Sequence, residues 1–318
     1  MQLVDVLIFA SGLVSSFIVG GNNNATALGI LISTRAIKRR LAYLLNAIAS
    51  SLGVFTGYFT MSSSVYGLFP DDNSFLVKLL ILSMLLSTVI SFYYLNRSGI
   101  PSSLSQMLYP SAVVLAIISH SRFNWSKFII TAISWAISPT LAIVASLGLY
   151  YLLVHSIISE RKVIRQMKVY KSLITFSALF TSFVTGANAI GLIVSAGLIS
   201  FPSIVVIPSY ALATALGIYL TSTRVSITVG FRITRLGYIA SISALTGGNI
   251  ISEIFTILGI PISITQTITG GIIGLSFRSM GTDVKEQLSK IGKGWVTSPT
   301  LSILVSLAIF GILRSIIS

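Results

Sequence analysis

Residues 99–106 read GIPSSLSQ and residues 259–266 read GIPISITQ, so one eight-residue pattern occurs twice, 160 positions apart. In each copy the Gly-Ile-Pro triplet would end one element and start a helix, because proline is tolerated in the first turn of a helix but not in its interior. Hydroxyl residues then occupy that first turn. The two stretches predict a pair of equivalent helix starts in the two halves of the chain.

Two further blocks support an internal repeat, which has to be sought before other features are interpreted. At the same offset of 160, Trp135 and the SPTL sequence at 138–141 match Trp295 and the SPTL sequence at 298–301. Near the front of each half, GGN at 20–22 matches GAN at 186–188, at an offset of 166. Three matched blocks in the same order predict two copies of one structural unit.

The composition places both copies in a membrane. Hydrophobic types make up 54% of the 318 residues and charged types 9%, whereas soluble domains contain about 25% charged residues. Ten apolar windows have roughly the length of a membrane span: 5–34, 41–61, 75–95, 101–119, 126–154, 172–200, 202–222, 236–257, 260–277 and 294–317. The first window contains Asp5 and a polar Gly-Asn cluster, so we do not interpret it as a cleaved signal peptide. We expect an all-helical integral membrane protein.

Each half contains five windows, so the second copy would enter the membrane in the opposite orientation. Such inverted repeats, with broken helices near the midplane, are typical of secondary transporters. If all ten windows cross, 17 Lys and Arg residues lie on one side and 4 on the other. By the positive-inside rule the first side is cytoplasmic. We predict a multi-pass cell-membrane protein with external termini, a first repeat over 1–155, a basic cytoplasmic linker over 156–171 and a second repeat over 172–318.

Several functional classes are disfavoured by residue content. The chain has no cysteine and only two histidines, and it shows no nucleophile–base pair, metal cluster or ATPase phosphate loop. We therefore expect no enzyme activity, no metal and no cofactor. The net charge of +14 lies in short loops between apolar runs, which does not indicate a nucleic-acid surface. The expected surroundings are the lipid bilayer, and a homo-oligomer is compatible with the sequence.

The first candidate site is the polar stretch GGNNNATALG at 20–29, in the middle of an apolar window. Consecutive amides in hydrocarbon are costly unless protein or a hydrated cavity satisfies them. The adjacent glycines weaken the helix, which favours a broken helix lining a polar pocket around Asn22, Asn23 and Thr26. The alternative is helix packing through glycine and interhelical amide hydrogen bonds.

The second candidate site is the pair of helix starts. Free backbone N–H groups, the positive end of the helix dipole and hydroxyl donors favour an anion such as phosphate. The alternative is ordinary N-capping by Ser and Thr, but pairing by an inverted repeat favours a substrate site near the midplane. The candidate substrate ligands are Asn22, Ser102, Ser103, Ser105, Gln106, Asn188, Ser263, Thr265 and Gln266.

These residues resemble the inorganic phosphate transporter (PiT) family. Each half of that family carries a Gly-Ala-Asn-Asp-x-Ala-Asn-x-x-Gly signature and a later Gly-x-Pro-x-Ser-Thr-Thr-Gln/His signature. The resemblance implies a transporter that moves phosphate with sodium or protons, with some relatives moving sulfate. The matching positions are Gly20, Asn22, Ala25 and Gly29, with Gly186, Ala187 and Asn188, for the first signature, and Pro101, Ser103, Gln106, Pro261, Ser263, Thr265 and Gln266 for the second.

The sequence departs from the family mainly at acidic positions. The signature Asp is Asn23 in one copy and Ala189 in the other, and the family's Glu in the second helix of each half aligns with Ser50 and Thr214. Sodium coupling is therefore in doubt, whereas transport of phosphate by alternating access remains the expected function. Sulfate or other oxyanion transport, or anion binding without transport, are the alternatives. The coupling ion, proton or sodium, stays open, with Asn23, Thr26 and Glu253 as candidate residues, Glu253 being the one carboxylate well inside a window.

Overall fold

The computed structural model describes residues 3–70, 74–97, 102–158, 163–221, 237–276 and 282–317. Within these ranges the chain is helical and forms no strand. The elements are α1 (Leu3–Asn23), α2 (Ala25–Thr34), α3 (Arg39–Met61), the short η1 (Tyr66–Leu68), α4 (Phe75–Arg97), α5 (Leu104–Ser119), α6 (Trp125–Ile158), α7 (Val163–Val184), the π-helix η2 (Thr185–Ile190), α8 (Gly191–Gly197), α9 (Ser203–Thr221), α11 (Tyr238–Ile257), α12 (Ile264–Ser276) and α13 (Thr282–Ile317).

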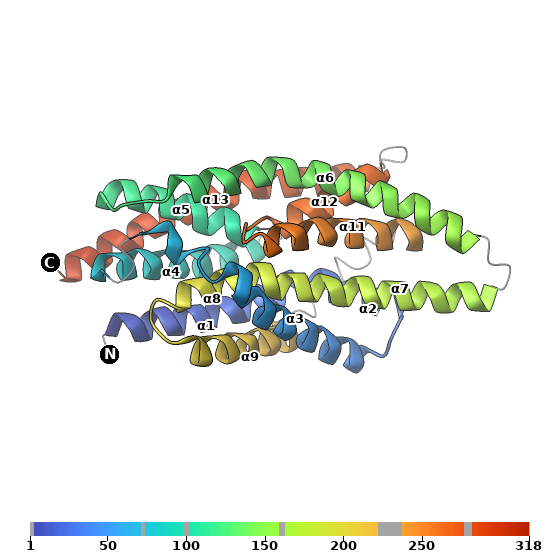
Figure 1. Ribbon diagram of the computed structural model, residues 1–318, viewed down its shortest axis with the longest axis horizontal. Coiled ribbons are helices and arrows are strands. Elements are labelled where there is room, and N and C mark those ends of the chain that lie inside the picture. Colours follow the sequence, from blue (N-terminus) through green and yellow to red (C-terminus); the bar gives the residue numbers. More distant parts are fainter. Residues whose placement is uncertain are drawn as a thin grey trace.

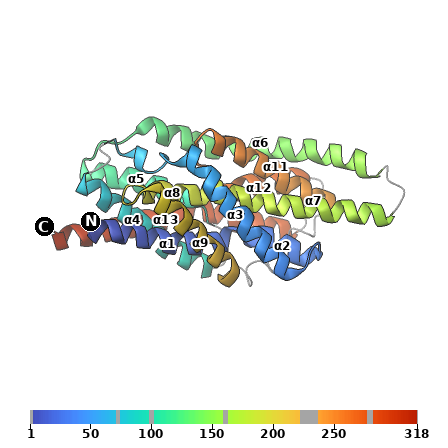
Figure 2. The same ribbon diagram turned by 60° about the horizontal axis from the view of Figure 1, so that its bottom comes forward.

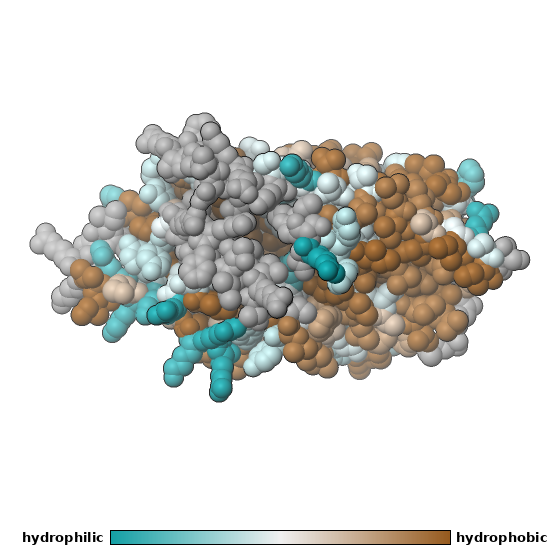
Figure 3. Space-filling model, turned by 180° about the vertical axis from the view of Figure 1, so that it is seen from behind, coloured by the Kyte–Doolittle hydropathy of each residue, from teal (hydrophilic) through white to brown (hydrophobic). Residues whose placement is uncertain are grey.

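The helices lie mostly along one long axis, and both chain ends lie at the same end of the molecule (Figures 1 and 2). The end of α6, the start of α7 and the α2–α3 junction lie at the opposite end. Large hydrophobic side chains, such as Phe59 and Ile204 at 80% exposure, cover the outside of the helices. Figure 3 shows wide hydrophobic areas on one face of the molecule. This surface suits contact with lipid tails and supports the membrane assignment.

Every predicted apolar window contains one helical stretch, but not every stretch is long enough to cross a bilayer. Seven stretches are long and apolar enough to do so. Helices α5 and α12 have 16 and 13 residues, or about 24 and 20 Å at 1.5 Å per residue, which is less than the ~30 Å hydrocarbon core. Helices α5 and α12 are therefore too short to span the hydrocarbon core by themselves, because they begin only at Leu104 and Ile264.

The long last helix of each half packs against the short helix of the other half. Helix α6 lies against α11 and α12, whereas α13 lies against α4 and α5. Ser302 of α13 shares hydrogen bonds with Ser87 of α4 at 3.3 Å and with Ser111 of α5 at 3.0 Å. Pro139 and Pro299 lie inside α6 and α13 without ending them. The two halves are thus interlocked rather than side by side.

Two reciprocal glycine contacts join the halves elsewhere. A Cβ on Gly20 of α1 would lie 2.8 Å from Thr214 of α9, and one on Gly186 of η2 would lie 1.9 Å from the carbonyl oxygen of Ser50 of α3. In each case the first long helix of one half packs against the second long helix of the other. This exchange is consistent with the expected inverted repeat. It also shows that the motif glycines serve close helix packing, which was the alternative interpretation of the first candidate site.

Candidate substrate site

The asparagine stretch interrupts the first membrane span at a single residue. Helix α1 ends at Asn23, Asn24 forms a turn, and α2 begins at Ala25. Asn24 is fully buried, and its amide donates to the carbonyl oxygen of Gly20 at 2.8 Å and to the Ser50 hydroxyl at 3.5 Å. Its Oδ1 has no hydrogen-bond partner among the described residues. Asn22, Asn23 and Thr26 are half-buried. The most enclosed asparagine is therefore Asn24, which is not among the predicted site residues.

The second copy of this stretch forms a π-helix. Residues Thr185–Ile190 widen the helix between α7 and α8, and single-turn π segments occur often at functional sites. Asn188 is 1% exposed, and its amide donates to the Thr256 hydroxyl of α11 at 2.8 Å. The predicted break therefore takes the form of a widened turn that presents Asn188 to α11.

The start of α5 brings together the predicted hydroxyl and amide residues of the first half. The side-chain oxygens of Ser103 and Ser105 lie 3.3 Å apart. Ser102, Ser103, Ser105 and Gln106 are all buried. The Ser102 hydroxyl and the Gln106 Oε1 have no hydrogen-bond partner among the described residues. Ser103 makes no side-chain capping hydrogen bond, so N-capping does not account for its place here.

The start of α12 repeats this arrangement in the second half. The side-chain oxygens of Ser263 and Thr265 lie 3.0 Å apart, and the backbone N–H of Gln266 donates to the Ser263 hydroxyl at 3.4 Å. Ser263 thus partly caps its helix, as the alternative interpretation expects. The Gln266 Oε1, like that of Gln106, has no partner among the described residues. Each helix start therefore combines a hydroxyl pair with an unsatisfied buried amide oxygen.

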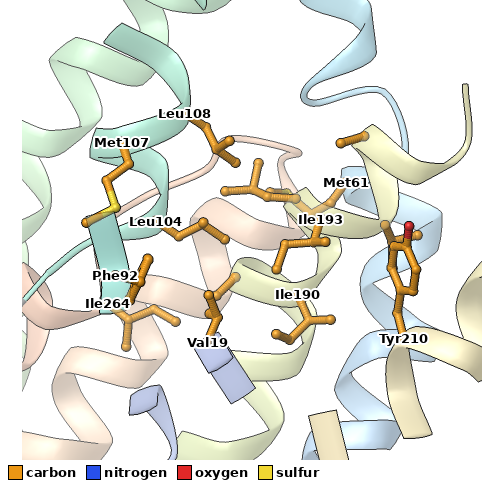
Figure 4. Close-up of a cluster of buried hydrophobic side chains, with 14 of the residues drawn as sticks. Val19, Met61, Phe92, Leu104, Met107, Leu108, Ile190, Ile193, Tyr210 and Ile264 are labelled. Atoms are coloured by element: carbon orange, nitrogen blue, oxygen red, sulfur yellow. The ribbon is translucent and has the colours of Figure 1, made fainter. Parts of the chain in front are cut away.

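The two helix starts and both interrupted helices meet at one hydrophobic cluster. Val19 of α1, Leu104 of α5, Ile190 of η2 and Ile264 of α12 belong to it, and Figure 4 shows their side chains close together. Each of these residues lies within two positions of a predicted site residue or motif glycine. The tertiary fold thus gathers the four predicted elements, although no hydrogen bond links the described residues of the α5 start to those of the α12 start.

Ser252 and Thr256 of α11 connect Asn188 with the start of α12. The sequence interpretation did not include these two residues. Thr256, which accepts from Asn188, donates to the carbonyl oxygen of Ser252 at 2.8 Å, and the Ser252 hydroxyl lies 2.7 Å from the Thr267 hydroxyl in α12. Asn188 is thereby joined through α11 to the α12 start. The sequence could have identified them, because the four-residue spacing of Ser252 and Thr256 places two hydroxyls on one helix face.

Carboxylates are scarce around this region. Asp5, one of the two acidic residues whose side chains the structure describes, pairs with Lys78 at 2.7 Å near the start of α1. The other, Glu253 on α11, is partly exposed, and its Oε2 has no hydrogen-bond partner among the described residues. Ser50 and Thr214, which stand at the aligned acidic positions, are fully buried beside the motif helices. The described part of the chain contains no group of three His, Cys, Asp or Glu side chains that could hold a metal ion.

Comparisons with known proteins identify what this chain is similar to. The Phosphate transporter family profile matches residues 19–285. A Methanocaldococcus jannaschii protein bearing the name of a phosphate permease is 29% identical over 294 residues, 92% of each chain. A probable low-affinity inorganic phosphate transporter of Bacillus subtilis is 28% identical over 86% of each chain. The sulfate permease CysP of Bacillus subtilis is 25% identical over 91% of this chain and 82% of its own.

A solved structure described as the sodium-dependent phosphate transporter has the same fold. It matches with a TM-score of 0.88 over 99% of this chain and 100% of the solved chain, at 18% sequence identity. The fold resemblance thus extends beyond the part of the chain that the family profile matches. On the evidence of that profile, the sequence relatives and the shared fold, this chain is a member of the phosphate transporter family.

Proposed function

We propose that this protein is a secondary transporter that moves inorganic phosphate across the membrane by alternating access, with the anion bound between the α5 and α12 starts. The observation that carries the proposal is the pair of hydroxyl clusters at two helix N-termini, the buried Ser103–Ser105 and the partly buried Ser263–Thr265. First-turn N–H groups and the helix dipole favour an anion. Asn22, Ser102, Asn188 and the two glutamines complete the proposed ligand set.

Sulfate is the competing substrate. It is a tetrahedral oxyanion that uses the same donors, and one sequence relative is named a sulfate permease. The Gln106 and Gln266 amide oxygens favour phosphate, because they are buried acceptors without donors and monohydrogen phosphate carries a hydroxyl that can donate. Sulfate at neutral pH has no such hydrogen. A family member that binds an anion without moving it is the remaining alternative.

Uptake by purified protein in liposomes distinguishes these possibilities. We expect labelled phosphate to enter faster than labelled sulfate and unlabelled phosphate to compete for entry. Faster sulfate uptake would identify a sulfate permease. Binding of either anion by the detergent-solubilised protein, without uptake into liposomes, would identify a non-transporting binder.

We infer the coupling ion from the missing carboxylates. A sodium ion needs oxygen ligands whose charge compensates its own, whereas Asn23, Ala189, Ser50 and Thr214 are neutral. Moving a dianion inward against 100 mV costs about 4.6 kcal/mol, so import needs a co-transported cation or a steep concentration gradient. We propose proton coupling or downhill export, with weak sodium dependence. Strong phosphate accumulation driven by a sodium gradient at equal pH, and none driven by a pH gradient, would contradict this.

We also propose the orientation and domain organisation expected from the sequence. The α2–α3 junction and the start of α7, with residues Lys38, Arg39, Arg165, Lys168 and Lys171, would face the cytoplasm, and both termini would face outward. Repeats over 1–155 and 172–318 would then be related by an axis in the membrane plane, with the basic linker 156–171 on the cytoplasmic side.

A further inference from the structure

A row of polar contacts joins α7, η2 and α11 along their shared face. Ser177 lies 2.7 Å from Thr246 through their hydroxyl oxygens, Thr181 accepts from the amide of Asn249 at 2.6 Å, and Asn188 donates to Thr256 at 2.8 Å. The paired residues differ by 68 or 69 positions, so the two helices run parallel and in register. The contacts therefore form an ordered row, which ends at the proposed substrate site.

The orientation of the Asn249 amide follows from the hydrogen bonds of Thr181. The Thr181 hydroxyl donates to the carbonyl oxygen of Ser177 at 2.8 Å, so its oxygen is free to accept, and it accepts from Asn249 Nδ2. The Oδ1 of Asn249 is therefore directed away from Thr181. Asn249 is fully buried, and its Oδ1 receives no hydrogen bond from any described residue. A buried acceptor of this kind needs a donor.

Glu253 is placed to supply that donor. It lies four residues after Asn249 on α11, a spacing that puts the two side chains on the same face with Cβ atoms about 5–6 Å apart. At 100° per residue, position 253 falls in the same angular sector as 246, 249 and 256, all of which contact α7 or η2. The Oε2 of Glu253 is also buried and without a partner among the described residues. An ionised carboxylate cannot satisfy Asn249 Oδ1, whereas a protonated one can donate to it directly or through one water.

We propose that Glu253 is the protonation site through which this transporter couples anion movement to protons, and that Asn249 accepts the hydrogen bond of its protonated carboxyl. The proposal rests on the proposed transport function and goes beyond it by placing the proton away from the anion ligands. A proton taken from water on one side binds the Glu253 carboxylate, and it leaves to water on the other side after the conformational change. No bond other than O–H is made or broken.

The described helices packed against α11 carry no charged side chain in their middle turns. The helices packed against α11 are α3, α6, α7, η2 and α12, and α12 and η2 contain no titratable residue. On the other three, the charged residues, the histidine and the tyrosines all lie within about three turns of a helix end. These titratable groups are Arg39, Arg40, Tyr43 and Tyr58 on α3, Lys127, Tyr150, Tyr151 and His155 on α6, and Arg165, Lys168, Tyr170 and Lys171 on α7.

Glu253 adjoins the residues that tie α11 to the substrate site. Its neighbour Ser252 contacts Thr267 in the first turn of α12, and Thr256, one turn further, accepts from Asn188. A change in charge at Glu253 therefore acts on α11, and α11 contacts both Asn188 and the start of α12. This provides a physical route from proton binding to the anion ligands without a carboxylate among them.

The test uses the full-length protein in liposomes with a pH gradient, acidic outside, and labelled phosphate. We expect the wild type to accumulate phosphate. Glu253→Gln should lose accumulation and still exchange internal for external phosphate, because the neutral amide mimics the protonated carboxyl but releases no proton. Asn249→Leu should accumulate phosphate with its half-maximal pH shifted to more acidic values, because the protonated carboxyl loses its acceptor. Ser243→Ala, at another buried hydroxyl of α11, is the matched control and should behave as wild type.

The other outcomes separate this proposal from the transport proposal. Accumulation by Glu253→Gln equal to wild type would overturn the protonation site and leave phosphate transport intact. Loss of both accumulation and exchange in a Glu253→Gln protein that still elutes as a folded monodisperse species would also overturn it, since the residue would then act in the transport cycle itself. Failure of the wild type to move phosphate or sulfate would refute the transport function and, with it, this proposal.

Discussion

At the scale of single residues, the site depends on which polar atoms the fold leaves without partners. Besides the Oδ1 of Asn249, three buried amide oxygens, those of Asn24, Gln106 and Gln266, receive no hydrogen bond from described residues, and unpaired buried acceptors are costly. They lie beside the hydroxyl pairs of the two helix starts or beside Ser50. These amide oxygens would be satisfied by a ligand that donates a hydrogen bond, or by a water or cation bound between the ligand and the protein.

Removing hydroxyls at the α12 start should weaken anion binding. Ser263→Ala and Thr265→Ala each remove one donor to a charged ligand, which is worth about 1.5–3 kcal/mol, or roughly ten- to a hundred-fold in affinity. Equilibrium binding of labelled phosphate to the purified protein measures the change. Ser276→Ala, at the far end of α12 and also buried, is the control and should bind normally. Unchanged affinity in both site variants would remove Ser263 and Thr265 from the substrate site.

Adding a methyl group at Gly186 should destabilise the fold. Its Cβ would lie 1.9 Å from the carbonyl oxygen of Ser50, a backbone atom that cannot move aside. Overpacking of this kind costs about 1–3 kcal/mol, so Gly186→Ala should melt at a lower temperature in detergent. Gly148→Ala is the matched control, because nothing lies within 4 Å of a Cβ there. Equal melting temperatures for the two variants would contradict the close approach of η2 to α3.

At the scale of elements, helix length separates the helices long enough to cross a membrane from the short helices that begin at the proposed site. Helices α6 and α13 have 34 and 36 residues, whereas α5 and α12 have 16 and 13. A short helix cannot hold its own position across the bilayer, and here each is held by the long helix of the opposite half. In the first half the contact is polar and runs through Ser302. In the second it runs through glycines of α12, with Gly270 packed on Pro139 and Gly271 on Ser146.

The Ser302 contact should contribute measurably to stability. Ser302→Ala removes the hydroxyl that contacts Ser87, Ser111 and the carbonyl oxygen of Met107. Interhelical hydrogen bonds in membranes contribute about 0.6 kcal/mol on average and up to about 1.7, so a loss in that range is expected. Unfolding in a denaturing detergent measures it. Ser315→Ala, at an exposed residue of the same helix, should have a smaller effect, and the reverse order would refute the role of Ser302.

At the scale of the whole molecule, charge is distributed unevenly between the two ends. Arg35, Lys38, Arg39 and Arg40 cluster at the α2–α3 junction, which lies opposite the chain termini (Figure 2). The Asp5–Lys78 pair lies near the starts of α1 and α4, and α1 begins at the end where the termini lie. A cluster of Lys and Arg at one end is what the positive-inside rule expects of the cytoplasmic side.

Thiol labelling tests the resulting orientation in this cysteine-free chain. Ser74→Cys, at the exposed residue before α4, should react with an impermeant maleimide added to intact cells, and Ser156→Cys, exposed near the end of α6, should react only after permeabilisation. Both variants are at serines, so the side chains change little. Labelling of Ser156→Cys but not Ser74→Cys in intact cells would invert the topology.

The sequence by itself determined the class of protein, the ten helical windows and the two helix starts. These are local properties: transfer of apolar side chains to lipid depends on composition, and the Gly259-Ile260-Pro261 triplet separates the end of α11 at Ile257 from the start of α12 at Ile264. Only the tertiary structure decided that Asn24 rather than Asn22 is enclosed, that Asn188 lies on a π-helix facing Thr256, and that α6 and α13 exchange partners. The rotation of a helix about its axis is set by contacts distant in sequence, such as Gly20 against Thr214, and these leave no local signature.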